Sequence, residues 1–128
     1  MLQPMSNKES YWRKRAKAFG YAWQGIAELF SKEAHAKIHL LATVSVIAFA
    51  IIFKCTPAEW CLLLLCIGGV LMGEGFNTAV ERVCDRVSPE KHPLIKAAKD
   101  IAAGAVLLFV IASVAVGLII FIPKFIGC

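Results

Sequence analysis

The sequence predicts an all-α membrane protein, in which an N-terminal amphipathic surface helix precedes three transmembrane helices and the second of these extends into the cytoplasm. Two observations predict this class. Of the 128 residues, 59% are hydrophobic and 18% are charged, and the mean hydropathy is +0.68. Three apolar stretches lie at residues 38–53, 60–73 and 101–122, behind a basic N-terminal segment. A small soluble domain needs more polar surface and a disordered chain has fewer apolar residues, so both classes are excluded.

The N-terminal segment, residues 1–37, has the pattern of a helix that lies flat on a membrane. Its apolar residues recur at spacings of three and four, which places them on one stripe: Trp12, Ala16, Phe19, Trp23, Ile26 and Phe30. Basic and polar residues lie mostly off this stripe. Basic helices that carry tryptophan on their apolar face bind at membrane interfaces. The seven Lys and Arg residues of the segment argue against a cleavable signal peptide.

The first membrane helix is expected at about 38–53. This stretch is shorter than the ~20 residues that cross a bilayer unless the helix also includes Ala34 and Ala36. The whole chain, 1–128, is expected to form a single integral-membrane domain.

The second membrane helix is expected over 57–87. Thr56-Pro57-Ala58-Glu59 offers an N-cap threonine, a proline in the first helical position and a glutamate in the third, and Ser88-Pro89 provides the stop. Such a helix measures ~46 Å at 1.5 Å per residue, so its C-terminal part is expected to stand in water. His92-Pro93 then opens the third helix, expected over 93–122.

The Lys and Arg residues are distributed unevenly along this layout. Seven lie in residues 1–37 and five between Arg82 and Lys99, whereas only Lys54 and Lys124 lie at the opposite helix ends. Cytoplasmic loops are enriched in Lys and Arg, so the N-terminus and the second connection are expected in the cytoplasm. The net charge of +5 is thus explained by topology, and no nucleic-acid partner is expected. The five cysteines have no zinc-site spacing and are expected to be apolar fillers.

Four polar residues share one face of the second helix, because they follow at increments of three, four and four: Glu74, Asn77, Glu81 and Asp85. Three carboxylates on one face repel one another unless protons or a cation neutralise them. Glu81 could instead pair with Arg82, and Asp85 with Arg86 or Lys99, as a solvated helix end. Glu74 has no Lys or Arg within four residues in the sequence.

A cationic segment follows, comprising Glu90-Lys91-His92-Pro93 and then Lys96, Lys99 and Asp100. Lysines beside a helix N-terminus can bind phosphate, and they can equally anchor the helix at the cytoplasmic face. The small residues of 97–105 permit close helix packing. Carboxylates opposite cations suggest a magnesium–nucleotide site, although the chain has neither a Walker A motif nor a kinase glycine-rich loop. The residues alone therefore indicate a multi-pass membrane protein with an anion or nucleotide site.

The acidic face also carries a family resemblance. Glu74-Gly-Phe-Asn77-Thr-Ala-Val-Glu81-x-x-x-Asp85 resembles the ExxN(S/T)A(V/I)ExxxD signature of the prokaryotic integral-membrane diacylglycerol kinase family, which includes undecaprenol kinases. Gly20-Tyr21-Ala22-Trp23-x-Gly25, Glu33 and Lys99-Asp100 support the resemblance, which covers nearly the whole chain. His39 and the segment from His92 to Gly104 are more similar to the undecaprenol kinase branch.

The resemblance implies a homotrimer of the bacterial inner membrane, with active sites shared between subunits. The reaction it implies is transfer of the γ-phosphate of MgATP to the hydroxyl of diacylglycerol or undecaprenol, giving phosphatidic acid or undecaprenyl phosphate. Glu74 would be the general base, Asn77 would position the reacting groups, and Glu33 and Glu81 would hold Mg²⁺. The implied ATP-binding residues are Lys14, Tyr21, Glu33, Glu81, Asp85, Glu90, Lys91, His92, Lys99 and Asp100. The implied lipid-binding residues are Lys14, Trp23, Glu74 and Ala103.

Two other classes compete with a lipid kinase. A small oligomeric ion or proton transporter would explain a carboxylate at Glu74, but not the acidic face that continues through Glu81 and Asp85. A pore-forming protein would need no acidic face at all.

Overall fold

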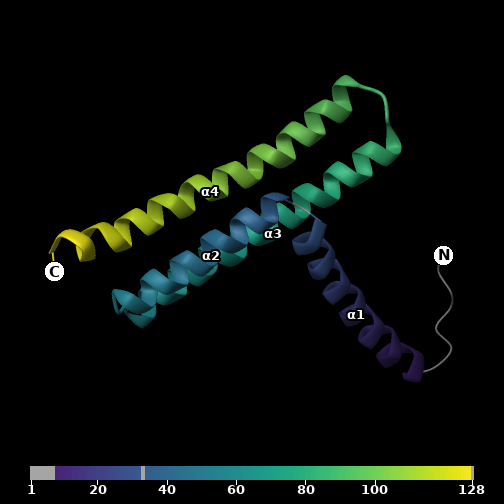
Figure 1. Cartoon of the computed structure of the whole chain (residues 1–128). Coiled ribbons are helices and arrows are strands. Elements are labelled where there is room, and N and C mark those ends of the chain that lie inside the picture. Colours follow the sequence, from purple (N-terminus) through teal and green to yellow (C-terminus); the bar gives the residue numbers. More distant parts are fainter. Residues whose placement is uncertain (1–7, 33, 128) are drawn as a thin grey trace. The chain divides into compact units, whose positions relative to one another are not determined.

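The computed structural model describes residues 8–32 and 34–127, and all four elements found there are helices: α1 (Lys8–Lys32), α2 (Ala34–Ile52), α3 (Pro57–Val87) and α4 (Pro93–Gly127) (Figure 1). No strand occurs in these residues. Three of the helices are long and apolar enough to cross a membrane, over His35–Ile52, Pro57–Val87 and Pro93–Gly127. The predicted all-α class, one N-terminal helix followed by three spans, is therefore confirmed.

The chain divides into two compact units, residues 1–34 and 35–128, and each is described by itself. The first unit consists mainly of α1, whose predicted apolar stripe is largely exposed, with Trp12, Phe19 and Trp23 all open to the surroundings. On the polar side, the guanidinium of Arg15 lies 4.9 Å from the centre of the Tyr11 ring. An uncovered aromatic stripe is what a helix that binds a membrane surface requires.

The second unit begins with α2, which starts early enough to include Ala36 and thus reaches the length that the short apolar stretch lacked. The helix ends in a turn in which Lys54 adopts a positive φ of 53°. Near this end, Ala50 of α2, Leu63 of α3 and Ile120 of α4 form a small buried cluster. Phe121 of α4 packs against this cluster. The rings of Phe121 and Phe125 lie 6.0 to 6.2 Å, between centroids, from those of Phe49 and of Phe53, which follows α2.

Helix α3 has the bounds that the sequence predicts. The Thr56 hydroxyl accepts a hydrogen bond from the Glu59 N–H (3.2 Å), and the Glu59 carboxylate accepts one from the Thr56 N–H (2.9 Å). At the other end, the Ser88 N–H donates to the Cys84 carbonyl and closes the last turn. Local capping chemistry thus determines both ends of the helix that carries the acidic face.

Helix α4 is longer than predicted, because it runs past the expected end at residue 122 and through Pro123 to Gly127. A proline inside a helix removes one backbone hydrogen bond but keeps a helical φ, so a helix held elsewhere can continue through it. Here the Lys124 ammonium lies 2.9 Å from the Glu59 carboxylate, which ties the last turns of α4 to the first turn of α3.

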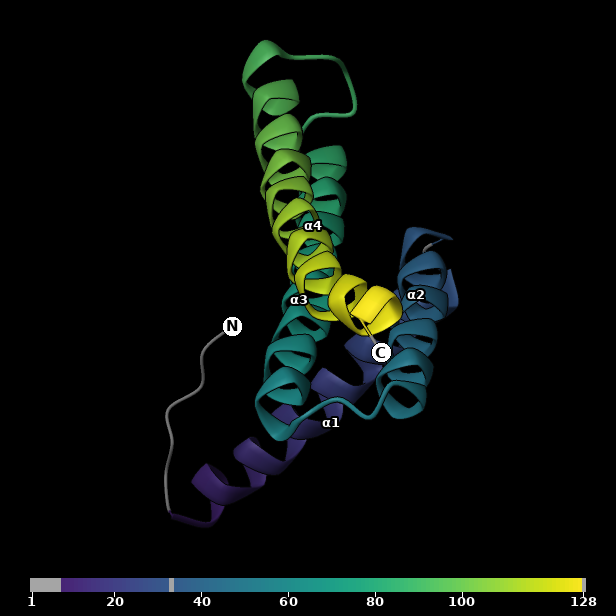
Figure 2. The same ribbon diagram turned by 90° about the vertical axis from the view of Figure 1, so that its left-hand side faces the viewer.

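Helices α3 and α4 run side by side and are joined by residues 88–92 (Figure 2). Their close approach depends on two glycines of α3. A Cβ at Gly69 would collide with the Phe109 ring of α4, and one at Gly73 would lie 3.4 Å from Val106 Cγ2. Gly104, in the small-residue stretch of α4 expected to provide this contact, faces open space instead.

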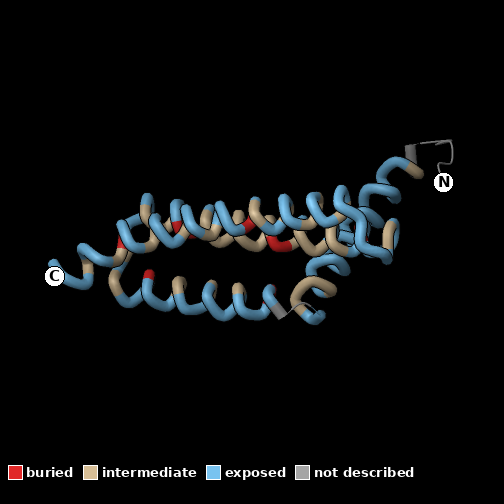
Figure 3. Tube along the Cα trace, turned by 90° about the horizontal axis from the view of Figure 1, so that it is seen from above, coloured by how far each residue is buried: buried red, intermediate tan, exposed pale blue. Residues whose placement is uncertain are grey.

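Exposed residues run along all three long helices of the second unit (Figure 3). Only 6 to 11% of each apolar window is buried. Helices that are apolar on all sides and yet uncovered need a lipid environment or further copies of the chain.

Candidate active site

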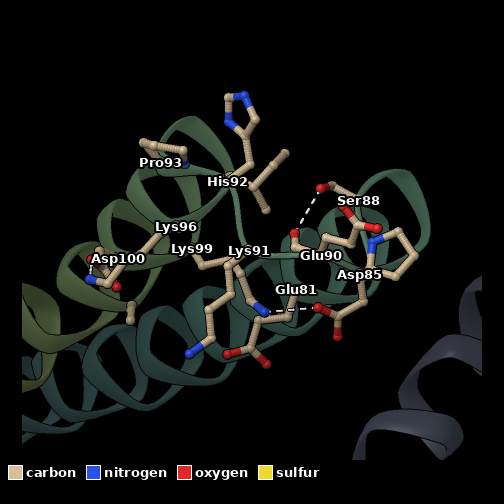
Figure 4. Close-up of a pocket in the computed structure, with 13 residues that line it drawn as sticks. Glu81, Asp85, Ser88, Glu90, Lys91, His92, Pro93, Lys96, Lys99 and Asp100 are labelled. Carbon is tan, nitrogen blue, oxygen red and sulfur yellow. Dashed lines mark hydrogen bonds and ion pairs between the residues drawn. The ribbon is translucent and has the colours of Figure 1, made fainter.

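A pocket of about 790 Å³ lies where α3 and α4 are joined (Figure 4). The last turns of α3, the connection 88–92 and the first turns of α4 form its wall. The residues that line it are Glu81, Asp85, Ser88, Pro89, Glu90, Lys91, His92, Pro93, Ile95, Lys96, Lys99, Asp100 and Ala103. Seven of the ten residues expected at the nucleotide are therefore gathered in one place, together with Ala103 from the expected lipid-binding set.

Two exposed ion pairs cross or flank this pocket. Lys99 Nζ lies 2.8 Å from Asp85 Oδ1, which links α4 to α3, and Lys96 Nζ lies 2.7 Å from Asp100 Oδ2 within α4. Of the pairings that the sequence left open for Asp85, the structure has the one with Lys99. Within the described residues Glu81 makes no hydrogen bond or ion pair, so its carboxylate stays available to a cation.

The connection itself is held by short hydrogen bonds. His92 Nδ1 accepts a hydrogen bond from the Leu94 N–H (3.1 Å), and its carbonyl accepts one from the Lys96 N–H (2.9 Å). His92 therefore caps the start of α4, and its ring points away from Glu81 in Figure 4. The Ser88 hydroxyl donates to the Glu90 carbonyl (2.8 Å) and shapes the preceding turn.

Glu74 lies seven residues before Glu81 on α3, outside the lining of the pocket, and its environment is different. It is the buried charged residue of the described chain, at 5% exposure. His39 of α2 places Nε2 3.4 Å from Glu74 Oε2. The sequence offered no partner for this carboxylate, because its partner is on another helix.

Asn77, one turn beyond Glu74 on α3, is half-buried. Its Oδ1 atom is buried and has no hydrogen-bond donor in the described structure. An amide oxygen left without a donor inside a protein is costly, and such atoms commonly mark functional positions. Glu74 and Asn77 thus provide a buried acid and an open acceptor close to each other on one helix.

The other predicted site residues are distributed as follows. Lys14, Tyr21 and Trp23 lie on α1 in the first unit, and all three are exposed. Glu33, expected to bind both Mg²⁺ and ATP, lies outside the described residues.

Sequence reasoning missed three contributors to the site. Ser88 and Ile95 line the pocket, although Ser88 was interpreted only as a helix stop. His39 was noted only for its similarity to one branch of the family. A histidine within an apolar span is itself a signal that a polar partner lies nearby, since ionisable residues in membrane helices seldom face lipid.

Magnesium fits the chemistry of this pocket. The described residues contain no group of three or more His, Cys, Asp or Glu side chains that could hold a metal ion. Mg²⁺, however, is usually held by one or two carboxylates together with substrate phosphates. Glu81, which has no other partner, is suited to be one of those ligands.

Comparison with known proteins agrees with the acidic motif. The sequence profile of prokaryotic diacylglycerol kinase matches residues 20–121. The undecaprenol kinase of Bacillus subtilis (strain 168) is 40% identical over 108 residues, which cover 84% of this chain and 88% of that protein. A diacylglycerol kinase of Synechocystis is 39% identical over 107 residues, 83% of this chain and 61% of that protein. The diacylglycerol kinase of Escherichia coli (strain K12) is 30% identical over 110 residues, 86% and 90% of the two chains. The chain therefore belongs to the prokaryotic diacylglycerol kinase family.

Proposed function

We propose that this chain is a membrane lipid kinase that transfers the γ-phosphate of MgATP to the hydroxyl of a lipid alcohol, either diacylglycerol or undecaprenol. Relatives that cover most of the chain are named for these two acceptors. No observation favours an ion or proton transporter.

One observation carries the proposal: a charged pocket and a buried carboxylate occur on the same membrane-length helix at different depths. Glu81 lines the pocket, and Glu74 lies seven residues nearer the centre of α3, a distance of ~10 Å. A nucleotide in the pocket would stay in water, while a lipid hydroxyl could reach Glu74 from the bilayer. The γ-phosphate would then lie between the two.

The residues of the chain suit this reaction. As the alcohol oxygen bonds to the γ-phosphorus and the bond to the departing ADP oxygen breaks, Glu74 takes the hydroxyl proton. The hydroxyl has a single proton, so the open Oδ1 of Asn77 would accept a hydrogen bond from another donor, such as a lysine ammonium beside the phosphates, and so help to position the reacting groups. Lys91 and Lys96 of the pocket can neutralise phosphate oxygens. Phosphoryl transfer depends mainly on alignment and charge neutralisation, so this small set of groups is sufficient.

Magnesium would be held by Glu81 and, following the family resemblance, by Glu33. Held there, Mg²⁺ would supply positive charge that offsets the negative charge of the phosphates. Lys99 and Asp85 pair with each other in the structure. When the nucleotide binds, they would either separate and contact it or stay paired beside it.

We further propose that the enzyme is a homotrimer of the bacterial inner membrane with its N-terminus in the cytoplasm. The many uncovered apolar residues of the spans support assembly in a bilayer. Following the family resemblance, Lys14 and Tyr21 of α1 would contact the nucleotide, and Lys14 and Trp23 would contact the lipid. The uneven distribution of Lys and Arg supports the orientation.

The activity is tested with the purified full chain in mixed micelles. Phosphorylated lipid is measured with MgATP and either diacylglycerol, undecaprenol or no acceptor. We expect ATP turnover that requires both magnesium and a lipid alcohol, and the preferred acceptor identifies the substrate. ATP turnover without phosphorylated lipid, or ion flux in vesicles without turnover, would contradict the proposal.

The orientation is tested by cysteine labelling in sealed inner-membrane vesicles. Ser88→Cys and Thr56→Cys are introduced separately into a chain whose native cysteines are replaced by serine or alanine. Cys55 lies next to Thr56, but burial and the nearby Glu59 carboxylate raise the pKa of its thiol. Its reaction with maleimide is therefore slow, because the thiolate is the reactive form. In right-side-out vesicles we expect an impermeant maleimide to label Thr56→Cys only. Labelling of Ser88→Cys from outside would overturn the orientation.

A further inference from the structure

The contact between Glu74 and His39 has no role in the reaction as described so far. We propose that His39 is a positioning residue: its imidazole, which is positively charged when protonated, holds Oε2 of the Glu74 carboxylate, so that Oε1 is directed to the alcohol hydroxyl. This inference rests on the proposed lipid kinase activity. It assigns a role to a residue outside both the nucleotide pocket and the acidic motif.

The burial of Glu74 makes a partner necessary. Its side chain is 6% exposed, in a part of the chain where every neighbouring span is apolar. Loss of hydration disfavours an ionised carboxylate, and an opposite charge nearby restores it. A general base must also point at the proton that it takes, and a carboxylate buried among apolar spans has few groups that can hold it in one orientation.

His39 is the residue placed to supply that charge. Among the described residues, it alone contacts the Glu74 carboxylate with a group that can become positive. On α4, the buried Val106 packs against Gly73, the residue before Glu74. The charged residues of α4 that come nearest before Val106, Asp100 and Lys99, lie at the pocket and pair with other residues. On α2, His35 and Lys37 are exposed, and on α3 the next carboxylate is Glu81.

His39 lies where α2 faces the other two spans. It lines an apolar cavity of about 250 Å³ between α2, α3 and α4, and its side chain is 23% exposed, while that of Glu74 is 6% exposed. Thr43 lines the same cavity, and its hydroxyl donates a hydrogen bond to the backbone carbonyl of His39 (2.8 Å). In these apolar surroundings few other groups compete for the carboxylate, so the imidazole beside Oε2 determines its orientation.

The test compares His39→Gln with the matched control His35→Gln, an exposed histidine one turn earlier on α2. Gln can still donate a hydrogen bond but carries no charge. Activity with MgATP and lipid alcohol is measured at pH 7 for the wild type and both variants. In His39→Gln we expect kcat at pH 7 to fall about tenfold while the KM for MgATP stays within about twofold. His35→Gln should match the wild type.

The split between kcat and KM, together with a double variant, separates positioning from a merely structural role. A residue that only supports the fold should lower the amount of folded protein, whereas a positioning residue should lower kcat in the folded protein and leave the KM for MgATP nearly unchanged. In a Glu74→Gln background, His39→Gln should add little further loss, because both act through one group.

Three results would overturn the inference. These are a folded His39→Gln variant with the wild-type kcat, a loss that appears in the KM for MgATP and not in kcat, and independent, multiplicative losses in the double variant. If His39→Gln does not fold, His39→Asn takes its place, and failure of both to fold shows that the residue serves stability alone. A wild-type chain that turns over no lipid alcohol overturns the proposed function as well, whereas an active wild type with an unaffected variant overturns this inference only.

Discussion

Helix α3 carries carboxylates in two contrasting environments. Glu74 is buried and has a single contact that can be positively charged, His39 of α2. Seven residues on, the pocket end is exposed, and several lysines stand opposite several carboxylates. Among the described residues, Glu74 therefore depends on one partner, whereas the carboxylates of the pocket have several lysines that can substitute for one another.

The contrast has a physical consequence. A charge removed from water depends strongly on the few groups around it, whereas exposed pairs are screened by water and salt. Substitutions near Glu74 should therefore change the reaction itself, while those at the pocket should change affinities by smaller steps. The following substitutions test that difference, from the largest expected effect to the smallest.

Glu74→Gln should lower kcat about 100-fold or more, the scale of losing a general base, because the amide cannot accept the alcohol proton. The KM for MgATP should change little, since the pocket lies further along α3. Steady-state turnover with lipid alcohol measures both constants. Glu59→Gln is the matched control, because it alters a glutamate at the far end of the same helix.

A folded Glu74→Gln variant with near-normal turnover would show that this carboxylate is not the base. Thermal melting and size-exclusion chromatography in detergent establish whether the variant is folded and has the size of the wild type. A variant that unfolds would assign Glu74 to stability rather than to the reaction.

Glu81→Gln should raise the magnesium concentration needed for half-maximal activity about tenfold, because a carboxylate ligand is lost while the phosphates still bind the ion. Activity is titrated with magnesium at saturating lipid and a fixed concentration of ATP. Glu33→Gln, from the family resemblance, should behave alike. Unchanged magnesium dependence in both variants would remove the metal assignment.

Gly69→Leu should destabilise the pair of helices that forms the pocket, by about 1–3 kcal/mol for overpacking. The new side chain would collide with the Phe109 ring, whereas Gly68→Leu, one residue earlier, enters open space and serves as the control. Thermal unfolding in detergent measures both. Equal stability of the two variants would contradict the close approach of α3 and α4 at this position.

Asp85→Asn should have the smallest effect. Its ion pair with Lys99 is exposed, so removing it should leave the thermal midpoint nearly unchanged, and high salt should remove what difference remains. The KM for MgATP should rise by less than the change in magnesium dependence caused by Glu81→Gln. If Asp85→Asn unfolds the protein cooperatively instead, the exposed pocket end depends on single interactions more than the surroundings of Glu74 do, and the comparison is wrong.

Much of this architecture could be predicted from local chemistry. The start and end of α3 follow from Thr56, Glu59 and Ser88, whose hydrogen bonds join residues three or four apart. The grouping of Glu81 and Asp85 near Lys99 also follows, because a short connection returns the chain beside itself. The end of α4 was predicted wrongly, since Pro123 does not stop a helix whose last turns are tied to α3.

Local pattern alone is enough to identify a membrane protein with three spans and to reveal the family through its acidic motif, because helix periodicity and apolar length are properties of contiguous residues. It contains no information on which faces of different helices meet. Tertiary structure decided that His39 contacts Glu74 across 34 intervening positions, that Lys99 rather than Arg86 binds Asp85, and that Gly69 receives Phe109. Those choices depend on packing and on the cost of leaving a charge buried without a partner, which arises only once the helices come together.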